Sequence, residues 1–247
     1  MVYLILGMHK SGTTLLAETL HKSGINMIEE EFNDDSNYKT GHKYERPSTN
    51  QLNKQLLKTD DMFDFSTSSN GIVISPEQRD KMEEIVSLYG TRYGDWGFKD
   101  PRTVLTYDSW KEILPIDHKI IIVYRKPSQI MSHVMAGVRR PDRKLIRSIK
   151  ALEAWKAYNN KLLKIINEHR DNRDRCMVIN YHDLMTKKSI HQGLSSFIKR
   201  EVKDARRMDS YNFRDDNNLL LKLQDTFSRD KAEDIYSDLE KSKLQTA

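Results

Sequence analysis

The stretch "GMHKSGTT" at residues 7–14 directly follows the apolar run "VYLIL". A short apolar run predicts a buried strand, and the leucines after the loop, spaced along one helical face, predict a helix over residues 13–23. The loop has the G-x-x-x-x-G spacing that lets a backbone turn tightly around a phosphate, and the helix N-terminus behind it favours an anion. The chain therefore begins with a strand–loop–helix unit of an α/β fold, with an anion site at the turn.

The order of residues in this loop differs from that of loops that bind ATP or GTP. In those loops the second glycine is followed by lysine and then by Ser or Thr. Here Thr13 follows Gly12, and the only lysine, Lys10, lies inside the loop. A turn that needs its glycines only for geometry is the alternative interpretation. The lysine and the three hydroxyl side chains in the same loop favour a phosphate ligand.

A second apolar strand is predicted at "KIIIVYR", residues 119–125. Enzymes that hydrolyse nucleoside triphosphates usually place an Asp at the end of such a strand to hold Mg²⁺. This strand ends instead in Arg125, a cation that repels Mg²⁺ but can hold a phosphate through two parallel hydrogen bonds. Pro127 starts a helix two residues later, so a second anion site is predicted beside the first. The pattern favours a nucleotide with phosphates at two positions and no obligatory metal.

The remaining chain alternates between strand-like and helix-like segments. Further strands are predicted at residues 96–100 and 176–181, and helices at about 49–57, 75–89, 142–169 and 190–199, with Gly90 ending the second of them. The long helix carries an apolar stripe of Leu145, Ile149, Leu152, Trp155 and Leu162. This alternation predicts a three-layer α/β/α fold with a mostly parallel central sheet, similar to P-loop nucleotide hydrolases. We expect residues 1–247 to form one domain, with about 201–247 as a charged helical C-terminal extension anchored by the leucines at 219–223.

Composition excludes several other classes of protein. Cys176 is the only cysteine, which rules out an intrachain disulfide or a multi-cysteine metal site and favours a reducing, cytoplasmic setting. No apolar run approaches the ~20 residues that span a bilayer, and the N-terminus does not resemble a signal peptide. The net charge of +5 is spread over interspersed charges without a basic helix-turn-helix, so we expect no nucleic-acid partner.

These motifs together resemble the sulfotransferase family that uses 3′-phosphoadenosine 5′-phosphosulfate (PAPS). "HKSGTT" resembles the family's loop for the 5′-phosphosulfate, and "YRKPSQIMSH" resembles its segment for the 3′-phosphate. "LNKQLL", "FKDPR", "LEAWKAY" and "VINYHDLM" add further matches, in the order that bacterial-type sulfotransferases show, over residues 2 to about 200. The resemblance implies metal-independent, in-line transfer of the sulfuryl group of PAPS to a hydroxyl or amine acceptor, with no metal ligands in the chain.

The resemblance also implies which residues hold the donor. The loop residues that match the 5′-phosphosulfate site are His9, Lys10, Ser11, Gly12, Thr13 and Thr14. Lys10 is placed to reach the oxygen that bridges phosphate and sulfate, whereas a lysine after Gly12 would address a triphosphate that this donor lacks. Arg125 matches the arginine on the 3′-phosphate. The family's serine falls eight residues after that arginine, where this chain has His133, so either Ser132 or His133 is expected to take its place.

Two charged residues are the candidates for catalysis beside Lys10. Lys99 in "FKDPR" matches a family lysine that stabilises the transferring charge, although a surface lysine at a strand end is the alternative. Glu45 in "GHKYERP" matches by position the glutamate that takes the acceptor proton, with a solvated loop glutamate as the alternative and His42 as the second candidate base. Asp100 is expected to cap the following helix ahead of Pro101, with a role as base as its alternative.

The acceptor is the least constrained part of the prediction. A carbohydrate, lipid, small alcohol, phenol or peptide tyrosine would fit, and the segments 29–47, 59–75 and 134–145 are expected to line its pocket. The basic stretch Arg139, Arg140, Arg143, Lys144 and Arg147 is either a solvated face or a contact for the 3′-phosphate or an anionic acceptor. Two other functions stay open: a kinase or phosphotransferase that uses Mg-ATP, and a non-catalytic nucleotide-binding module of the same fold.

Overall fold

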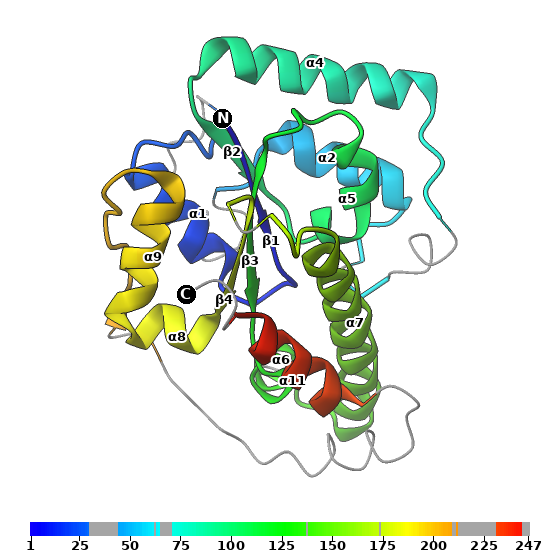
Figure 1. Cartoon of the computed structure of the whole chain (residues 1–247). Helices are drawn as coiled ribbons and strands as arrows, with labels where there is room; N and C mark the ends of the chain where they lie inside the picture. Colours follow the sequence, from blue (N-terminus) through cyan, green and yellow to red (C-terminus); the bar gives the residue numbers. More distant parts are fainter. Residues whose placement is uncertain are drawn as a thin grey trace.

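Four strands form one sheet at the centre of the chain (Figure 1). A computed structural model describes residues 1–29, 44–61, 63–64, 71–136, 138–172, 174–208, 211 and 231–243. The strands are β1 (Val2–Leu6), β2 (Trp96–Lys99), β3 (Lys119–Tyr124) and β4 (Cys176–Asn180), and they lie in the order β2-β1-β3-β4. All three neighbouring pairs are parallel, which confirms the predicted α/β class with its parallel central sheet.

The strand order fixes where the candidate residues meet. Because the strands are parallel, the segments that follow them emerge at one edge of the sheet. β1 pairs with β2 on one side and with β3 on the other, so the chain crosses over in opposite directions from β1. Ligands of such sheets bind at the point where the strand order reverses, outside the carboxyl ends of the strands. The loop after β1 occupies that point.

Helices cover both faces of the sheet (Figure 1). One face carries α1 (Thr13–Lys22), α8 (Tyr181–Thr186) and α9 (Lys188–Ile198). The other carries α2 (Pro47–Leu57), α4 (Pro76–Arg92), α5 (Thr103–Lys111), α6 (Pro127–Met135), α7 (Pro141–Glu168) and α11 (Ala232–Lys243). The side chains of β1 alternate between two apolar clusters, Leu4 and Leu6 in one and Tyr3 and Ile5 in the other. Burial on both faces explains why this strand is apolar throughout.

α4 begins as predicted and ends later than predicted. Ser75 caps it through a reciprocal pair of hydrogen bonds with Gln78. The helix continues through Gly90 to Arg92 instead of ending at the glycine. A glycine inside a helix costs only about 1 kcal/mol relative to alanine. Packing of the buried Tyr89 ring 5.3 Å from that of Trp96 holds this part of the helix in place.

The predicted apolar stripe of α7 is correct only for part of the helix. Leu152, Trp155 and Leu162 are buried in the larger core, as expected. Leu145 and Ile149 are 45% and 44% exposed, so their assignment to the core was wrong. The first turns of α7 keep that side in contact with solvent, and a cavity described below opens beside them.

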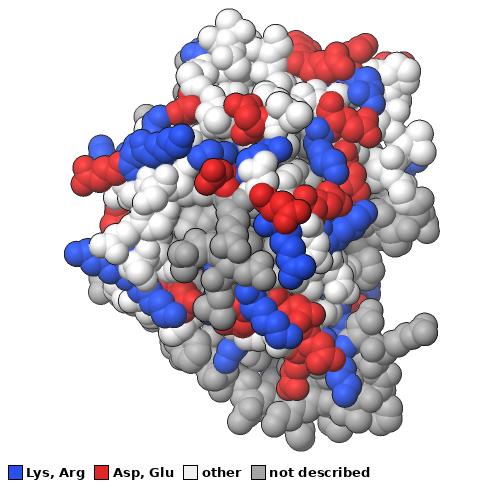
Figure 2. Space-filling model, in the orientation of Figure 1, with Lys and Arg blue, Asp and Glu red and all other residues white. Residues whose placement is uncertain are grey.

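Of the predicted C-terminal extension, residues 201–208, 211 and 231–243 are described, and α11 packs against α7 and β4. The leucines at 219–223 lie outside the described residues. No helix in the described ranges is long and apolar enough to cross a membrane. On the face of the molecule seen in Figure 1, basic and acidic side chains are interspersed, as expected from the sequence (Figure 2).

Candidate active site

The loop after β1 has a tightly turned backbone. Lys10 and Gly12 both adopt left-handed conformations, with φ of 66° and 98°. A Cβ on Gly7 would lie 2.4 Å from the carbonyl oxygen of Val123 in β3, so only glycine lets the loop run this close to the neighbouring strand. The two predicted glycines are therefore required by geometry, one by close approach and one by its backbone angle.

The loop leads directly into an uncapped helix. α1 starts at Thr13, and no side chain caps its first turn. Ser11 and Thr13 are buried and Thr14 is half-buried, so their hydroxyls lie at the same turn as the free N–H groups. The ring of His9 meets that of Tyr158 edge-on at 6.2 Å. Uncapped N–H groups beside hydroxyls form the kind of site that accepts an anion.

Arg125 follows β3 and lies against this loop. Its Nε donates to Oε1 of Gln129 at 2.9 Å, and its Nη1 donates to the carbonyl oxygen of Lys10 at 3.2 Å. The guanidinium carbon lies 4.4 Å from the centre of the Tyr181 ring. Burial lowers the pKa of Arg125. Arg125, which was predicted to bind a phosphate, therefore contacts the loop that was predicted to bind another.

Tyr181 forms a wall of this site that the sequence alone did not reveal. A Cβ on Gly12 would lie 2.2 Å from Cδ2 of its ring, so the tyrosine packs on the loop as well as on Arg125. The available signal was its position, since Tyr181 directly follows the buried strand β4 and so emerges at the same sheet edge.

Ser132 and His133 both lie on α6, which starts two residues after Arg125. Ser132 is half-buried, and His133 has a lowered pKa. The causes are partial burial and the positive charges of Arg125 and Lys10. His133 is therefore within electrostatic reach of both cations. Which of the two side chains contacts a phosphate stays a prediction.

Lys99 and Glu45 form a buried ion pair on the other side of the loop. Nζ of Lys99 lies 2.7 Å from Oε1 of Glu45 and 3.4 Å from Oγ1 of Thr14. The exposed fractions of the two side chains are 1% and 8%. Oε2 of Glu45 accepts a hydrogen bond from Nδ2 of Asn50 at 3.1 Å. Neither the solvated lysine nor the solvated glutamate that the sequence left open agrees with this burial.

Arg46 anchors Glu45 at this position. It is fully buried, and it donates from Nε to the carbonyl oxygen of Gly97 at 2.8 Å and from Nη2 to that of Asn26 at 2.9 Å. Its guanidinium carbon lies 4.1 Å from the centre of the Tyr89 ring. This anchor was missed in the sequence because a buried arginine is not distinguishable there from an exposed one.

Asp100 acts as a cap. Its Oδ1 accepts the backbone N–H of Arg102 at 2.9 Å and its Oδ2 accepts Nδ2 of Asn53 at 3.1 Å, in the turn before α5. Burial, with the charge of Glu45 nearby, raises the pKa of Asp100. The capping interpretation agrees with this geometry. The second candidate base, His42, lies outside the described residues.

The chain is similar to known sulfotransferases. A model of a sulfotransferase family matches residues 3–192. Among solved structures, the sulfotransferase domain from the Synechococcus PCC 7002 olefin synthase has 18% identity and a TM-score of 0.50, covering 94% of this chain and 79% of that one. A sulfotransferase domain from the curacin biosynthetic pathway has 18% identity and a TM-score of 0.49, covering 93% and 78%. No curated protein sequence matches the chain. At this identity the first structure supports the fold alone.

Proposed function

This chain belongs to the sulfotransferase family, and we propose that it transfers the sulfuryl group of PAPS to a hydroxyl or amine acceptor. The buried pair of Lys99 and Glu45 beside Thr14 carries the proposal. It combines a cation that can neutralise transferring charge with a carboxylate that can take a proton, next to the anion loop. A non-catalytic module needs neither group, and Mg-ATP chemistry is disfavoured by Arg125 at the strand end where an Asp would hold Mg²⁺.

The proposed donor site uses two anion-binding groups. The loop with Lys10, Ser11 and the hydroxyls of Thr13 and Thr14 would hold the 5′-phosphosulfate. Arg125, with Ser132 or His133, would hold the 3′-phosphate. The hydrogen bond from Arg125 to the Lys10 carbonyl supports this assignment, because it places the guanidinium group beside the loop. PAPS supplies the activated sulfuryl group, and the chain supplies positioning and charge.

The proposed transfer forms one bond to sulfur and breaks another. The acceptor oxygen or nitrogen forms a bond to sulfur while the bond from sulfur to the bridging oxygen of the donor breaks. That oxygen keeps the electron pair, and Lys10 stabilises it on the departing 3′-phosphoadenosine 5′-phosphate. The acceptor proton passes to Glu45. When Glu45 takes the proton it loses its charge, so the ion pair with Lys99 is broken. The Lys99 ammonium then stabilises the negative charge on the sulfuryl oxygens.

Ligand-induced stabilisation tests donor binding. We expect 3′-phosphoadenosine 5′-phosphate without metal, at about 100 times its Kd, to add about 2.7 kcal/mol to the free energy of unfolding. Adenosine 5′-monophosphate, which lacks the 3′-phosphate, is the matched ligand control and should stabilise much less. Stabilisation by Mg-ATP but not by 3′-phosphoadenosine 5′-phosphate would refute the proposal in favour of a kinase.

Turnover tests catalysis separately. Transfer of radiolabelled sulfate from PAPS is followed over a panel of carbohydrates, lipids, alcohols, phenols and tyrosine peptides. Loss of a general base lowers turnover by about 10²–10⁴-fold, so Glu45→Gln should lose transfer while keeping donor binding. Donor binding without sulfation of any panel member would instead indicate a non-catalytic nucleotide-binding module.

A further inference from the structure

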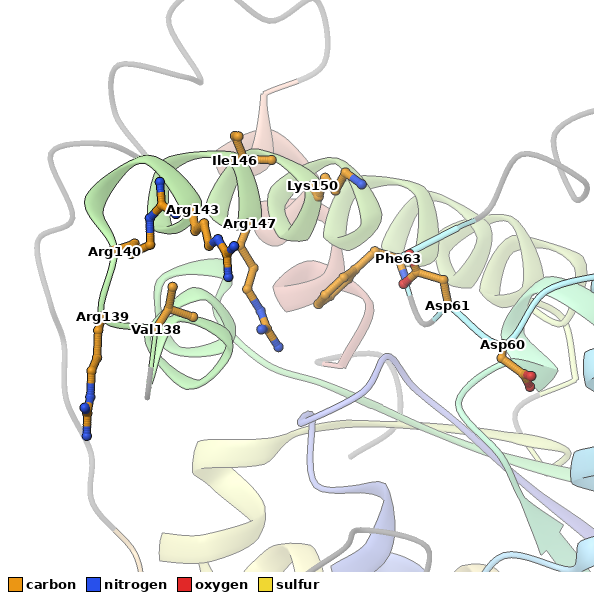
Figure 3. A pocket seen from close by; sticks show the side chains of 10 residues that line it. All are labelled: Asp60, Asp61, Phe63, Val138, Arg139, Arg140, Arg143, Ile146, Arg147 and Lys150. Carbon is orange, nitrogen blue, oxygen red and sulfur yellow. The ribbon is translucent and has the colours of Figure 1, made fainter.

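A cavity of about 820 Å³ opens between residues 60–63 and the first turns of α7 (Figure 3). This volume is within the range of small-molecule sites. Its lining residues are Asp60, Asp61, Phe63, Val138, Arg139, Arg140, Arg143, Ile146, Arg147 and Lys150. They belong to two of the segments expected to form the acceptor pocket, extended along α7.

One wall of this cavity is basic, and most of its cations have no counter-ion in the described part of the chain. Arg140, Arg143, Arg147 and Lys150 recur every three or four residues, which places them along one side of the helix. Within the described ranges, the side chains of Arg143, Arg147 and Lys150 have no hydrogen bond or ion pair, whereas that of Arg140 is paired with the exposed Asp142 at 3.0 Å. Like charges at this spacing destabilise a helix. A bound anion would remove this repulsion.

The cavity also has an apolar part. Phe63, Val138 and Ile146 line it, and Ile146 is 57% exposed. Phe63 and Arg147 extend toward each other from opposite walls, whereas Arg139 extends away along the outer rim (Figure 3). A ligand here would contact hydrocarbon and guanidinium groups at once.

The two carboxylates of the cavity already interact with groups of the chain. Asp60 lies 3.1 Å from Nζ of Lys54, and Oδ1 of Asp61 accepts the backbone N–H of Phe63 at 2.9 Å. A neutral N–H leaves the negative charge on Asp61, but the lining has five cationic side chains and only two carboxylates, of which Asp60 is already paired. The cavity keeps a net preference for an anion.

Contacts of Arg102 connect the cavity wall to the proposed transfer site. Nη2 of Arg102 donates to the carbonyl oxygen of Asp60 at 3.0 Å, and its Nη1 lies 3.4 Å from Oδ1 of Asp100. Asp100 directly follows Lys99 at the end of β2. A single chain of contacts thus joins the cavity to the strand end that carries the proposed catalytic lysine.

We infer that this cavity binds the acceptor, and that the acceptor is an amphiphilic alcohol carrying a phosphate or carboxylate. Arg143 and Arg147 hold its anionic group, while Phe63 and Ile146 contact its hydrocarbon part. The inference rests on the proposed function and names the substrate class for it.

Three ten-carbon alcohols test the charge preference: 1,10-decanediol, 10-hydroxydecanoate and 10-hydroxydecyl phosphate. They share a hydroxyl at one end and differ at the other end, which carries a neutral hydroxyl, a carboxylate or a phosphate. One charged hydrogen-bonded contact is worth about 1.5–3 kcal/mol, or roughly tenfold and more in binding. We expect kcat/KM to be at least about tenfold higher for the better anionic acceptor than for the diol. Equal or higher kcat/KM for the diol overturns the inference.

The variant Arg143→Ala/Arg147→Ala should lower kcat/KM for the anionic acceptor by about 10–100-fold and for the diol by less than about twofold. Lys164→Ala/Arg170→Ala is the matched control, since it removes the same charge from exposed positions near and just beyond the C-terminal end of the same helix. Both variants should retain stabilisation by 3′-phosphoadenosine 5′-phosphate. If the control variant loses the preference equally, the cavity is not its source.

Binding of decyl phosphate tests the inference even if no alcohol is sulfated. Decyl phosphate has no hydroxyl, so it can bind but not react. By titration calorimetry it should bind the protein loaded with 3′-phosphoadenosine 5′-phosphate, and binding should be lost in Arg143→Ala/Arg147→Ala. Equal binding to the variant, or competition with the donor, overturns the inference. Failure of the proposed function appears differently, as absent stabilisation by 3′-phosphoadenosine 5′-phosphate.

Discussion

Breaking the buried pair of Lys99 and Glu45 should destabilise the fold as well as abolish transfer. Lys99→Met keeps most of the length of the side chain but removes the cation from the Glu45 carboxylate, which still accepts a hydrogen bond from Asn50. Removing one partner of a buried ion pair costs about 3–5 kcal/mol. Domains are stable by about 5–15 kcal/mol, so this is a large fraction of the total.

Equilibrium unfolding in urea at pH 7 measures the effect. With a urea dependence of about 2–3 kcal/mol per molar, the expected loss shifts the midpoint of Lys99→Met downward by about 1–2.5 M. The double variant Lys99→Met/Glu45→Gln removes both charges and should recover most of the loss. The coupling free energy between the two sites should therefore reach about 2 kcal/mol.

Activity and stability should separate in this cycle. The double variant regains stability but has neither a base nor a neutralising cation, so its transfer rate stays at the level of the single variants. A Lys99→Met variant within about 0.5 kcal/mol of the unmodified protein would refute the reasoning. Strictly additive single effects would refute it equally, because they would mean that the two side chains do not interact.

Three further perturbations follow from the site. Gly12→Ala places a Cβ against the Tyr181 ring at a positive φ, so it should lower the free energy of unfolding by about 1–3 kcal/mol and weaken 3′-phosphoadenosine 5′-phosphate binding. Gly90→Ala, in an open helical position, should instead stabilise the protein by up to about 1 kcal/mol. Urea unfolding measures the stability of both variants, and calorimetry measures ligand binding. His133 has a lowered pKa and is neutral at pH 7 in the free protein, so a bound phosphate should raise that pKa. Ligand binding should therefore become stronger as the pH falls from 7 to 6 and His133 gains a proton. NMR titration measures the pKa and calorimetry the Kd, and a pH-independent Kd would contradict the prediction. Arg46→Lys cannot reproduce two guanidinium hydrogen bonds and the ring contact, so it should lose about 2 kcal/mol of stability in urea unfolding and lower turnover; unchanged stability would contradict the anchor role.

The sheet was predictable because its strands carry strong local signals. The run at 120–123 is β-branched throughout, and such a run on a chain of alternating helices and strands indicates a strand buried on both faces. The loop was predictable for a similar reason, since its glycines are required by its own backbone. Both signals depend on neighbours in sequence, which a single sequence displays directly.

The remaining features depend on contacts between distant segments. The spacing of Leu145 and Ile149 is correct for a buried face, yet no spacing reveals that the core does not extend under the first turns of α7. The burial of Glu45 depends on Arg46 reaching the carbonyl oxygen of Gly97, a residue far along the chain. Tertiary contacts of this kind decide which polar residues are buried, and local pattern carries no information about them.

The strand order assigns different parts of the proposed reaction to different sides of the loop. Lys99 and Glu45 lie on the β2 side, whereas Arg125, His133 and Tyr181 lie on the side of β3 and β4. A donor with phosphates at its two ends would then lie across β1, with its sulfuryl group toward β2. Changes on the β2 side should therefore lower kcat with little change in the Kd for 3′-phosphoadenosine 5′-phosphate, and changes on the β3 side should raise that Kd. Substitution of Arg125 that lowered kcat alone would show that the donor does not lie in this direction.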